Sequence, residues 1–511
     1  MDFVDFSNSF WSVIPPLLAL SLAIVTRKVL LSLSAGIIVG ALMLTGGNIL
    51  NAARYTFSNV ASLVYSDGGF NADYTNIILF LLLLGVLTSL LTISGSNQAF
   101  VSWAQKHIKQ KRGAKLLTVF LGVFIFIDDY FNSLAVGAIA RPVTDKYKIS
   151  RAKLAYLLDS TAAPMCVIMP ISSWGAYIIT LVGGLLATHA ITEYSPIGAF
   201  MAMIGMNFYA IFALVMVFIV AIFSFDIGPM AHFERNAEKA DAIEDEIAGG
   251  KHGRVIDLIL PILVLIIGTI SMMIYTGAQS LAADGQAFSI LGAFENTTVG
   301  TSLVVGGVAA LITATLCALS SRQISLKEYL LAYGLGVKSM FGAILVLFFA
   351  WTINTVVSDI HTGKYLSSLV SDSVAIGFLP VLLFILSALM AFSTGTSWGT
   401  FGIMLPIAAS IAVNADPSLL LPCLSAVMAG AVCGDHCSPI SDTTILSSTG
   451  ASCNHIDHVT TQLPYALLVA ASSAVGYLVV GFTKSGWLGF FATAIVMIGL
   501  ILFFKKRMAM R

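Results

Sequence analysis

The sequence predicts an all-α polytopic membrane protein, built as an inverted structural repeat with about eleven transmembrane helices and two re-entrant hairpins. Composition is the first observation: 58% of the 511 residues are hydrophobic, 10% are charged, and the mean hydropathy is +0.92. Soluble domains carry about 25% charged residues. The second observation is a series of apolar stretches of membrane-spanning length, and the third is a duplicated order of polar motifs.

Apolar stretches set the expected crossings, because a helix needs about 20 mostly apolar residues to span a hydrocarbon core of about 30 Å. Two stretches, 116–140 and 377–412, do not fit as simple spans because of the charges around them. The expected crossings at 152–188 and 418–452 are long and interrupted. In chain order the candidate crossings are 11–26, 29–46, 77–94, 152–188, 197–223, 254–276, 299–319, 336–357, 418–452, 463–482 and 487–504.

Basic residues flank the stretch 116–140 on both sides, so both of its ends are expected in the cytoplasm. A segment that enters and leaves the membrane on one side is a re-entrant hairpin. The stretch 377–412 has almost no Lys or Arg around it except Lys364, which predicts a second hairpin entering from the outer face. The basic residues around the first hairpin are Lys106, Lys109, Lys111, Arg112, Lys115, Arg141, Lys146, Lys148, Arg151 and Lys153.

The distribution of basic residues also orients the whole chain. With the N-terminus outside and the C-terminus in the cytoplasm, every Lys and Arg is cytoplasmic except Arg54, Lys364 and Lys484. The opening MDFVDF carries acids where a signal peptide would be positive, so no cleaved targeting sequence is expected. The formal net charge is zero, and no nucleic-acid surface is predicted. The six cysteines lie in or near apolar segments and are expected to be free thiols.

A charged stretch near the midpoint divides the chain, and we interpret residues 225–253 as a cytoplasmic linker. This linker separates a first repeat, residues 1–224, from a second repeat, residues 254–482. Residues 483–511 add a further transmembrane helix and a basic tail. The acidic run of the linker is interpreted as a solvated helix; its members are Glu234, Glu238, Asp241, Glu244, Asp245 and Glu246.

The same order of polar motifs occurs in both halves, which indicates a repeat. In the first half, Asp128–Ser133 (DDYFNS) in the hairpin precedes Pro170–Ser173 (PISS); in the second, Ser393–Thr400 (STGTSWGT) precedes Pro439–Asp442 (PISD). Five spans and one hairpin make an odd number of crossings, so the second half enters the membrane inverted. Such repeats are typical of secondary transporters. The alternative is that the two Pro-Ile-Ser triplets are coincidental proline kinks.

The stretch Ala431–Gly450 holds two carboxylates, Asp435 and Asp442, on either side of Pro439. A membrane interior tolerates ionisable groups only where they face a cavity or a partner. Proline has no backbone N–H and Gly434 is flexible, so a helix here is expected to unwind and free its carbonyls for a cation.

Asp128 and Asp129 lie at the expected tip of the first hairpin. One carboxylate could simply cap the N–H groups of the turn. Two adjacent acids in a dry site cannot both be ionised cheaply, so at least one is expected to exchange a proton for a cation.

Neutral oxygens are concentrated at the four expected breaks, where they would suit a hard monovalent cation such as Na+. Hydroxyl groups also satisfy helix backbones in any membrane bundle, which is the alternative for each one. The candidate sodium or substrate ligands are Asn132, Ser133, Ser172, Ser173, Thr396, Ser397, Ser441 and Thr443.

Two aromatic residues, Trp174 and Trp398, each follow a serine and precede a glycine. They could line a pocket for an organic solute or pack against a neighbouring helix. His455 and His458 are expected near the cytoplasmic mouth, where imidazoles would sense or relay protons. The C-x-x-H-C spacing from Cys433 matches no usual zinc signature, so no transition-metal site and no cofactor are expected.

The segment GDHCSPISDTTILSSTGASCNHIDHVTTQLPYA (Gly434–Ala466) resembles the signature of the NhaC family of sodium/proton antiporters. Phe126–Gly137 (FIDDYFNSLAVG) and Gly395–Pro406 (GTSWGTFGIMLP) are similar to two further blocks of that family. The resemblance implies Na+-coupled secondary transport, and the wider ion-transporter superfamily implies an elevator mechanism, usually in a homodimer. The cation site that it implies involves Asp129, Asn132, Ser172, Ser397, Asp435, Ser441 and Asp442.

The leading hypothesis is therefore a Na+/H+ antiporter of the cell (inner) membrane, in contact with lipid, Na+ and H+. The alternative is a Na+-coupled carrier of an amino acid such as methionine, or of an organic acid of the malate/lactate type, on the same scaffold. An intramembrane enzyme that uses Asp435 and Asp442 is a third hypothesis. The inverted duplication favours a transporter over an enzyme, and hairpins entering from opposite sides suit alternating access better than an open channel.

Overall fold

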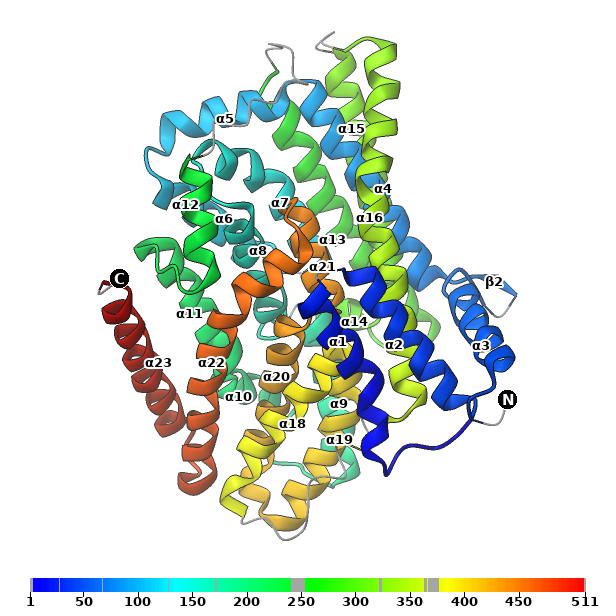
Figure 1. Ribbon diagram of the computed structural model, residues 1–511, viewed down its shortest axis with the longest axis vertical. Coiled ribbons are helices and arrows are strands. Elements are labelled where there is room, and N and C mark those ends of the chain that lie inside the picture. The colour runs from blue at the N-terminus through cyan, green and yellow to red at the C-terminus, as the bar shows by residue number, and fades with distance from the viewer. Residues whose placement is uncertain are drawn as a thin grey trace.

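The protein is nearly all helical, as Figure 1 shows for this computed structural model. The structure describes residues 3–26, 28–66, 68–126, 128–170, 172–239, 253–320, 324–362, 365 and 376–509. Several residues discussed above lie outside this part of the chain: Arg27, Asp241, Glu244, Asp245, Glu246, Lys251, Arg322, Lys364 and Arg511.

The first half of the chain contains short and long helices and one antiparallel ribbon of two strands. Its elements are η1 (Phe10–Val13), α1 (Ile14–Thr26), α2 (Val29–Leu44), α3 (Ile49–Ser62), β1 (Tyr65–Ser66), β2 (Gly69–Phe70), α4 (Ala72–Ile93), α5 (Ser96–His107), α6 (Lys111–Phe124), α7 (Asp129–Lys146), α8 (Arg151–Cys166), α9 (Ser173–Thr188), α10 (Pro196–Met206), α11 (Phe208–Phe223) and α12 (Pro229–Lys239).

The described part of the second half contains helices alone. These are α13 (Ile256–Ala283), α14 (Ile290–Glu295), α15 (Val299–Ser320), α16 (Leu326–Asp359), η3 (Ile376–Phe378), α18 (Leu379–Thr394), α19 (Ser397–Ala415), η4 (Pro417–Leu419), α20 (Leu420–Cys437), α21 (Asp442–Gly450), α22 (His455–Thr483) and α23 (Gly486–Ala509).

The helices pack in two groups. Helices α4, α13, α15 and α16 pack mainly on one another, and α2 packs on α16. The second group comprises α6–α11 and α18–α23, most of which fill a large shared core, while the buried apolar side chains of α7 and α21 pack in a core with those of α4, α13, α15 and α16. Helices α16 and α21 make one of the contacts between the groups. In Figure 1, α2, α3 and α16 lie on the right, α22 and α23 lie on the left, and α18 and α20 lie between them.

Both stretches expected to be hairpins consist of two helices that pack on each other across a short turn. Helices α6 and α7 are separated by residues 125–128, and α18 and α19 by Gly395 and Thr396. In Figure 1 the first pair lies in the upper half of the molecule and the second pair in the lower half. Gly395 has φ +68°, and a Cβ atom there would lie 2.6 Å from the carbonyl oxygen of Ile440. Glycine is therefore required where this tip meets the chain between α20 and α21. Re-entry from opposite faces of the membrane stays a prediction.

Each hairpin is followed by an interrupted helix, but the second interruption begins later than expected. Helix α20 continues through Gly434 to Cys437, so the expectation of unwinding at Gly434 was wrong. The chain leaves the helix at Ser438, beside Pro439, whose missing N–H ends the hydrogen-bond ladder. Gly434 instead allows close packing, because a Cβ atom there would lie 2.1 Å from the carbonyl oxygen of Ala388 on α18.

Length and hydropathy give fewer candidate spans than the sequence suggested. In the described ranges, nine helices are long and apolar enough to cross a membrane, or ten if α10 and α11, which meet at 52°, count as one. Two of these candidates, α18 and α19, are the helices of the expected second hairpin. Of the eleven expected crossings, eight remain in the described ranges, because α1 and α2 are short and the expected crossing at 152–188 is divided into α8 and α9. Helices α3, α5 and α14 were not expected.

The linker helix α12 is docked on the bundle, so its interpretation as a merely solvated helix was wrong at Glu234. The side chain of Lys153 on α8 is fully buried and forms ion pairs with Asp226 (2.7 Å) and Glu234 (2.9 Å). The backbone N–H of Ser150 also donates to Glu234 (2.8 Å). Burial alone would raise the pKa of Glu234, but Lys153 and Ser150 outweigh burial and lower the pKa below its usual value. Lys115 is buried too, and its ammonium donates to the hydroxyl of Ser224 (2.6 Å).

The close approach of α20 to α18 predicts that alanine substitutions at two glycines differ in their effect on thermal stability. Gly434→Ala should lower the thermal midpoint of the purified protein in detergent, because overpacking against backbone atoms costs about 1–3 kcal/mol. Gly184→Ala on α9 is the control, since a Cβ atom there would meet nothing within 4 Å. Equal midpoints for the two variants, read by size-exclusion after heating, would contradict a packing role for Gly434.

Candidate functional site

Four helix N-termini lie at the tips and breaks, and hydrogen bonds connect them. These helices are α7, α9, α19 and α21, which begin at Asp129, Ser173, Ser397 and Asp442. The N-terminus of a helix carries a partial positive charge of roughly +0.5 that favours carboxylates. The arrangement therefore provides a buried environment in which aspartates are stabilised by helix ends.

Asp129 bridges α9 and α21. The indole N–H of Trp174 donates to its Oδ1 atom (3.0 Å), and the hydroxyl of Thr443 donates to its Oδ2 atom (2.9 Å). Asp129 is 2% exposed, so these contacts are made away from bulk solvent. The first hairpin is thus joined to both interrupted helices through one carboxylate.

Asp442 and Asp435 also accept hydrogen bonds, from residues at the two hairpin tips and at the break between α20 and α21. The hydroxyl of Tyr130 donates to Asp442 Oδ2, and the backbone N–H of Thr443 donates to Asp442 Oδ1 (2.9 Å). The hydroxyls of Ser397 (2.7 Å) and Ser441 donate to Asp435. The three consecutive residues 441–443 therefore include one carboxylate, that of Asp442, and donate hydrogen bonds to two others, those of Asp435 and Asp129.

Asp128 acts as a cap in the structure. Its side chain accepts a hydrogen bond from the backbone N–H of Phe131 (3.1 Å) at the start of α7. This is the structural role that the sequence left open for one of the two adjacent acids.

Asn132 and Ser133, two of the expected cation ligands, bond to groups other than the three carboxylates. The amide nitrogen of Asn132 donates to the carbonyls of Gly122, Ile125 and Thr161, while its oxygen has no partner in the described structure. Ser133 pairs with Ser447 (2.9 Å).

Two further expected ligands, Ser172 and Thr396, lie at helix starts. Ser172 caps α9 by accepting from Gly175 N–H (2.8 Å) and donating to the carbonyls of Cys166 and Met169. Thr396 precedes α19 without a side-chain cap bond. The side chain of Ser173 lies outside the described structure.

The two tryptophans meet across the halves of the chain. The rings of Trp174 and Trp398 are 5.6 Å apart, and Trp174 also packs on Phe401 and Trp398 on Tyr177. Trp174 is 1% exposed. These contacts are those of the packing alternative, with the added role that the Trp174 indole holds Asp129.

His458 is buried inside the bundle, whereas His455 is half-buried at the start of α22; their expected place at the cytoplasmic mouth stays a prediction. His455 bonds the carbonyl oxygen of Pro439 through Nε2 (2.7 Å) and Ser448 through Nδ1 (3.1 Å). His458 is fully buried and bonds Asp159 (3.1 Å). Sequence reasoning missed Asp159, although an acid within the expected crossing 152–188 was a usable signal.

Tyr130 and Gln462 were missed as well, because neither residue type is unusual beside a polar motif. Among the residues that the structure describes, no group of three or more His, Cys, Asp or Glu side chains is arranged to hold a metal ion.

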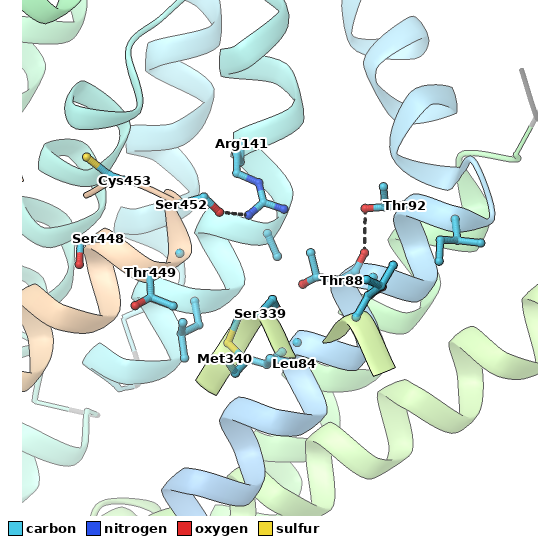
Figure 2. A pocket seen from close by; sticks show the side chains of 17 residues that line it. Leu84, Thr88, Thr92, Arg141, Ser339, Met340, Ser448, Thr449, Ser452 and Cys453 are labelled. Carbon is cyan, nitrogen blue, oxygen red and sulfur yellow. Dashed lines mark hydrogen bonds between the residues drawn. The ribbon is translucent and has the colours of Figure 1, made fainter. Parts of the chain in front are cut away.

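A cavity of about 500 Å³ lies between the two helix groups, beside the middle of α7 and the C-terminal end of α21. Its walls come from α4, α7, α16, α21 and the segment after α21. Figure 2 shows Arg141 pointing into it and bonded to Ser452, with Thr88 and Thr92 on the opposite wall and Ser339 below. Arg141 is the one charged residue that lines this cavity.

Comparison with known proteins identifies relatives along the whole chain. The model of the Na+/H+ antiporter family matches residues 165–482. A Haemophilus influenzae protein without assigned function is 67% identical over 99% of this chain and 98% of its own length. A malate-2H(+)/Na(+)-lactate antiporter of Bacillus subtilis is 35% identical, and a Na(+)/H(+) antiporter of Haemophilus influenzae is 36% identical; each match covers 20% of this chain and 22% of the relative.

The amide of Asn132 predicts a stability difference that is independent of transport. Asn132→Ala should destabilise the protein by about 1–3 kcal/mol, because buried carbonyl groups at the hairpin tip lose their donor. Asn414→Ala is the matched control, since that exposed amide donates only to Ser410 within its own helix. Thermal midpoints in detergent that fall equally in both variants would contradict this role.

Proposed function

The chain belongs to the Na+/H+ antiporter family, and on that premise we propose that it exchanges Na+ for protons at the group formed by Asp129, Asp435 and Asp442. The family is one of transporters, which are not an enzyme class. The observation that carries the proposal is the run 441–443, which brings three carboxylates from three separate helices, buried at Asp129 and Asp435 and half-buried at Asp442, into one hydrogen-bonded group.

Repulsion between the carboxylates couples Na+ binding to proton release. Several carboxylates that share a buried site cannot all be ionised without a cation, so in the absence of Na+ at least one holds a proton. A bound Na+ neutralises part of the charge and lets that proton leave. Asp442 and Asp129 are the proposed exchanging pair, with Asp435 as a third carboxylate held by Ser397 and Ser441.

Neutral oxygens complete the proposed site. The hydroxyls of Ser397, Ser441 and Thr443 already point at carboxylates, and rotation about χ1 would turn their lone pairs toward a cation. The helix N-termini favour the ionised carboxylates that Na+ requires. Na+ binding is thus supported without any soft ligand.

Movement is proposed to be of the elevator type, with the hairpins and interrupted helices moving against α4, α13, α15 and α16. The matched order of hairpin and interrupted helix in both halves supports an inverted repeat. The proposed setting is the inner membrane, with the N-terminus outside, the C-terminus in the cytoplasm, and a homodimeric assembly.

A second candidate function is Na+-coupled carriage of a small organic acid, and the cavity at Arg141 favours it. A volume of about 500 Å³ is far larger than a cation needs and is in the usual range for small-molecule sites. A guanidinium group would repel Na+ but recognise a carboxylate. Such a carrier would bind the anion near Arg141 and the cation at the aspartates.

Replacement of Asp442 tests the exchange site. Asp442→Asn in proteoliposomes should reduce Na+-driven proton flux, read by an internal pH dye, to the level of empty liposomes, because the amide cannot bind and release a proton. Asp416→Asn is the control: Lys484 (2.5 Å) and Ser418 lower the pKa of Asp416 to about 2, so this carboxylate stays ionised throughout the assay range. Wild-type flux in folded Asp442→Asn would remove Asp442 from the site.

Replacement of Arg141 tests the second candidate. If the cavity binds organic acids, wild-type protein should bind malate or lactate in calorimetric titration. Arg141→Gln should then weaken binding by about 1.5–3 kcal/mol, roughly 10- to 100-fold. Arg235→Gln, an exposed guanidinium on α12 bonded to its own helix, is the control. Absence of malate and lactate binding to wild type would reject this candidate and leave Na+/H+ exchange untouched.

A further inference from the structure

A second group of buried ionisable side chains lies apart from Asp129 and Asp442. Asp159 on α8 accepts hydrogen bonds at Oδ2 from His458 Nε2 (3.1 Å) and from Gln462 Nε2 (2.6 Å), both on α22. All three residues are at most 1% exposed. The amide nitrogen of Gln462 also donates to the carbonyl oxygen of His436 (2.5 Å). With both amide hydrogens used on acceptors, the orientation of Gln462 is fixed.

The charge of this group is not balanced by a permanent cation. In the described part of the chain, no lysine or arginine forms an ion pair with Asp159, and His458 is its ion-pair partner. An ionised carboxylate buried beside a neutral imidazole would carry an uncompensated charge, which membrane interiors strongly disfavour. One positive charge, bound reversibly, is therefore required for the group to be neutral.

The unpartnered atoms indicate what the group lacks. Asp159 Oδ1, Gln462 Oε1 and His458 Nδ1 are buried and have no hydrogen-bond partner in the described structure. When Nε2 of His458 donates to Asp159, its Nδ1 atom is an acceptor, so all three atoms are acceptors and none is a donor. A hydrogen-bonded group with three unpartnered buried acceptors is suited to receive a proton.

We propose that Asp159 and His458 form a second proton-binding site, which carries an additional proton through each cycle of the exchanger. The proposal rests on the Na+/H+ exchange proposed above. The proton binds to Asp159 or His458 and is shared across their hydrogen bond. It is released to water as H+ when the group becomes exposed to solvent, and no other bond is made or broken. Gln462 and the backbone of His436 connect this site to Asp435, the adjacent residue on α20.

Other titratable side chains surround the pair, and none of them is a permanent cation. His436 on α20 is hydrogen-bonded with Ser160 (2.9 Å) and with Tyr209 on α11 (2.8 Å), so both of its nitrogens are occupied. Charge interactions also reach the group from Asp435, on α20. The remaining titratable groups nearby are Tyr156 on α8, Cys433 and Cys437 on α20, and His455 on α22.

Two variants test the site, and Asn414→Ala is their control, because Asn414 is an exposed amide on α19 that has no titratable group. Asp159→Asn and His458→Gln each remove one partner and keep a polar side chain of similar size. The first measurement is proton uptake by purified protein in Na+-free detergent buffer between pH 5 and pH 9. Both variants should take up one proton fewer than wild type, and the control should match wild type.

The second measurement is the number of protons exchanged per Na+ in proteoliposomes, obtained from the voltage at which flux reverses. Both variants should exchange one proton fewer per Na+, with 22Na+ binding within about threefold of wild type. Unchanged proton uptake and unchanged stoichiometry in a folded variant would overturn the proposal. If wild type shows no Na+-driven proton flux, the exchange function fails, while the uptake measurement still decides whether Asp159 and His458 bind a proton. If Asp159→Asn does not fold, His458→Gln decides alone.

Discussion

The interruption between α20 and α21 is the constraint on which the rest of the candidate site depends. Pro439 cannot donate to a helix ladder, so the chain leaves α20 at Ser438 and begins α21 at Asp442. The new helix start places Asp442 near two further carboxylates, because Ser441 bonds Asp435 and Thr443 bonds Asp129. A continuous helix would spread these side chains around its axis. The break instead lets them contact Asp435, Tyr130 and Asp129, so that residues of both hairpin tips meet at the start of α21.

Tight backbone contacts hold the elements around this break in place. Gly434 lets α20 approach α18, and Gly395 lets the second hairpin tip approach Ile440. The amide of Asn132 closes the first tip. Close packing therefore fixes the positions of these helices and tips, so short polar side chains are enough to reach one another. Buried carboxylates tolerate such a setting because helix N-termini and hydroxyl donors replace water around them.

The buried polar groups extend beyond this break. Asp159, His458 and Gln462 occupy the core between α8 and α22, and Lys153 fixes the linker helix α12 at one end of α8. Helix α8 therefore carries one charged contact to the linker, at Lys153, and another inside the bundle, at Asp159. This position makes α8 a physical connection between the linker and the interior of the bundle.

The sequence by itself determined the features that depend on local composition and chain chemistry. Membrane crossings follow from apolar length, the two helix pairs from their apolar stretches and flanking charges, and the break from Pro439, so Asp129, Asp435 and Asp442 could be named in advance as site candidates. Only the tertiary structure decided that Asp128 caps a helix, that Tyr130 binds Asp442 and that Asp159 binds His458, which lies 299 residues away. Such pairings are contacts between helices distant in the sequence, and no local pattern encodes which side chains will face each other after packing.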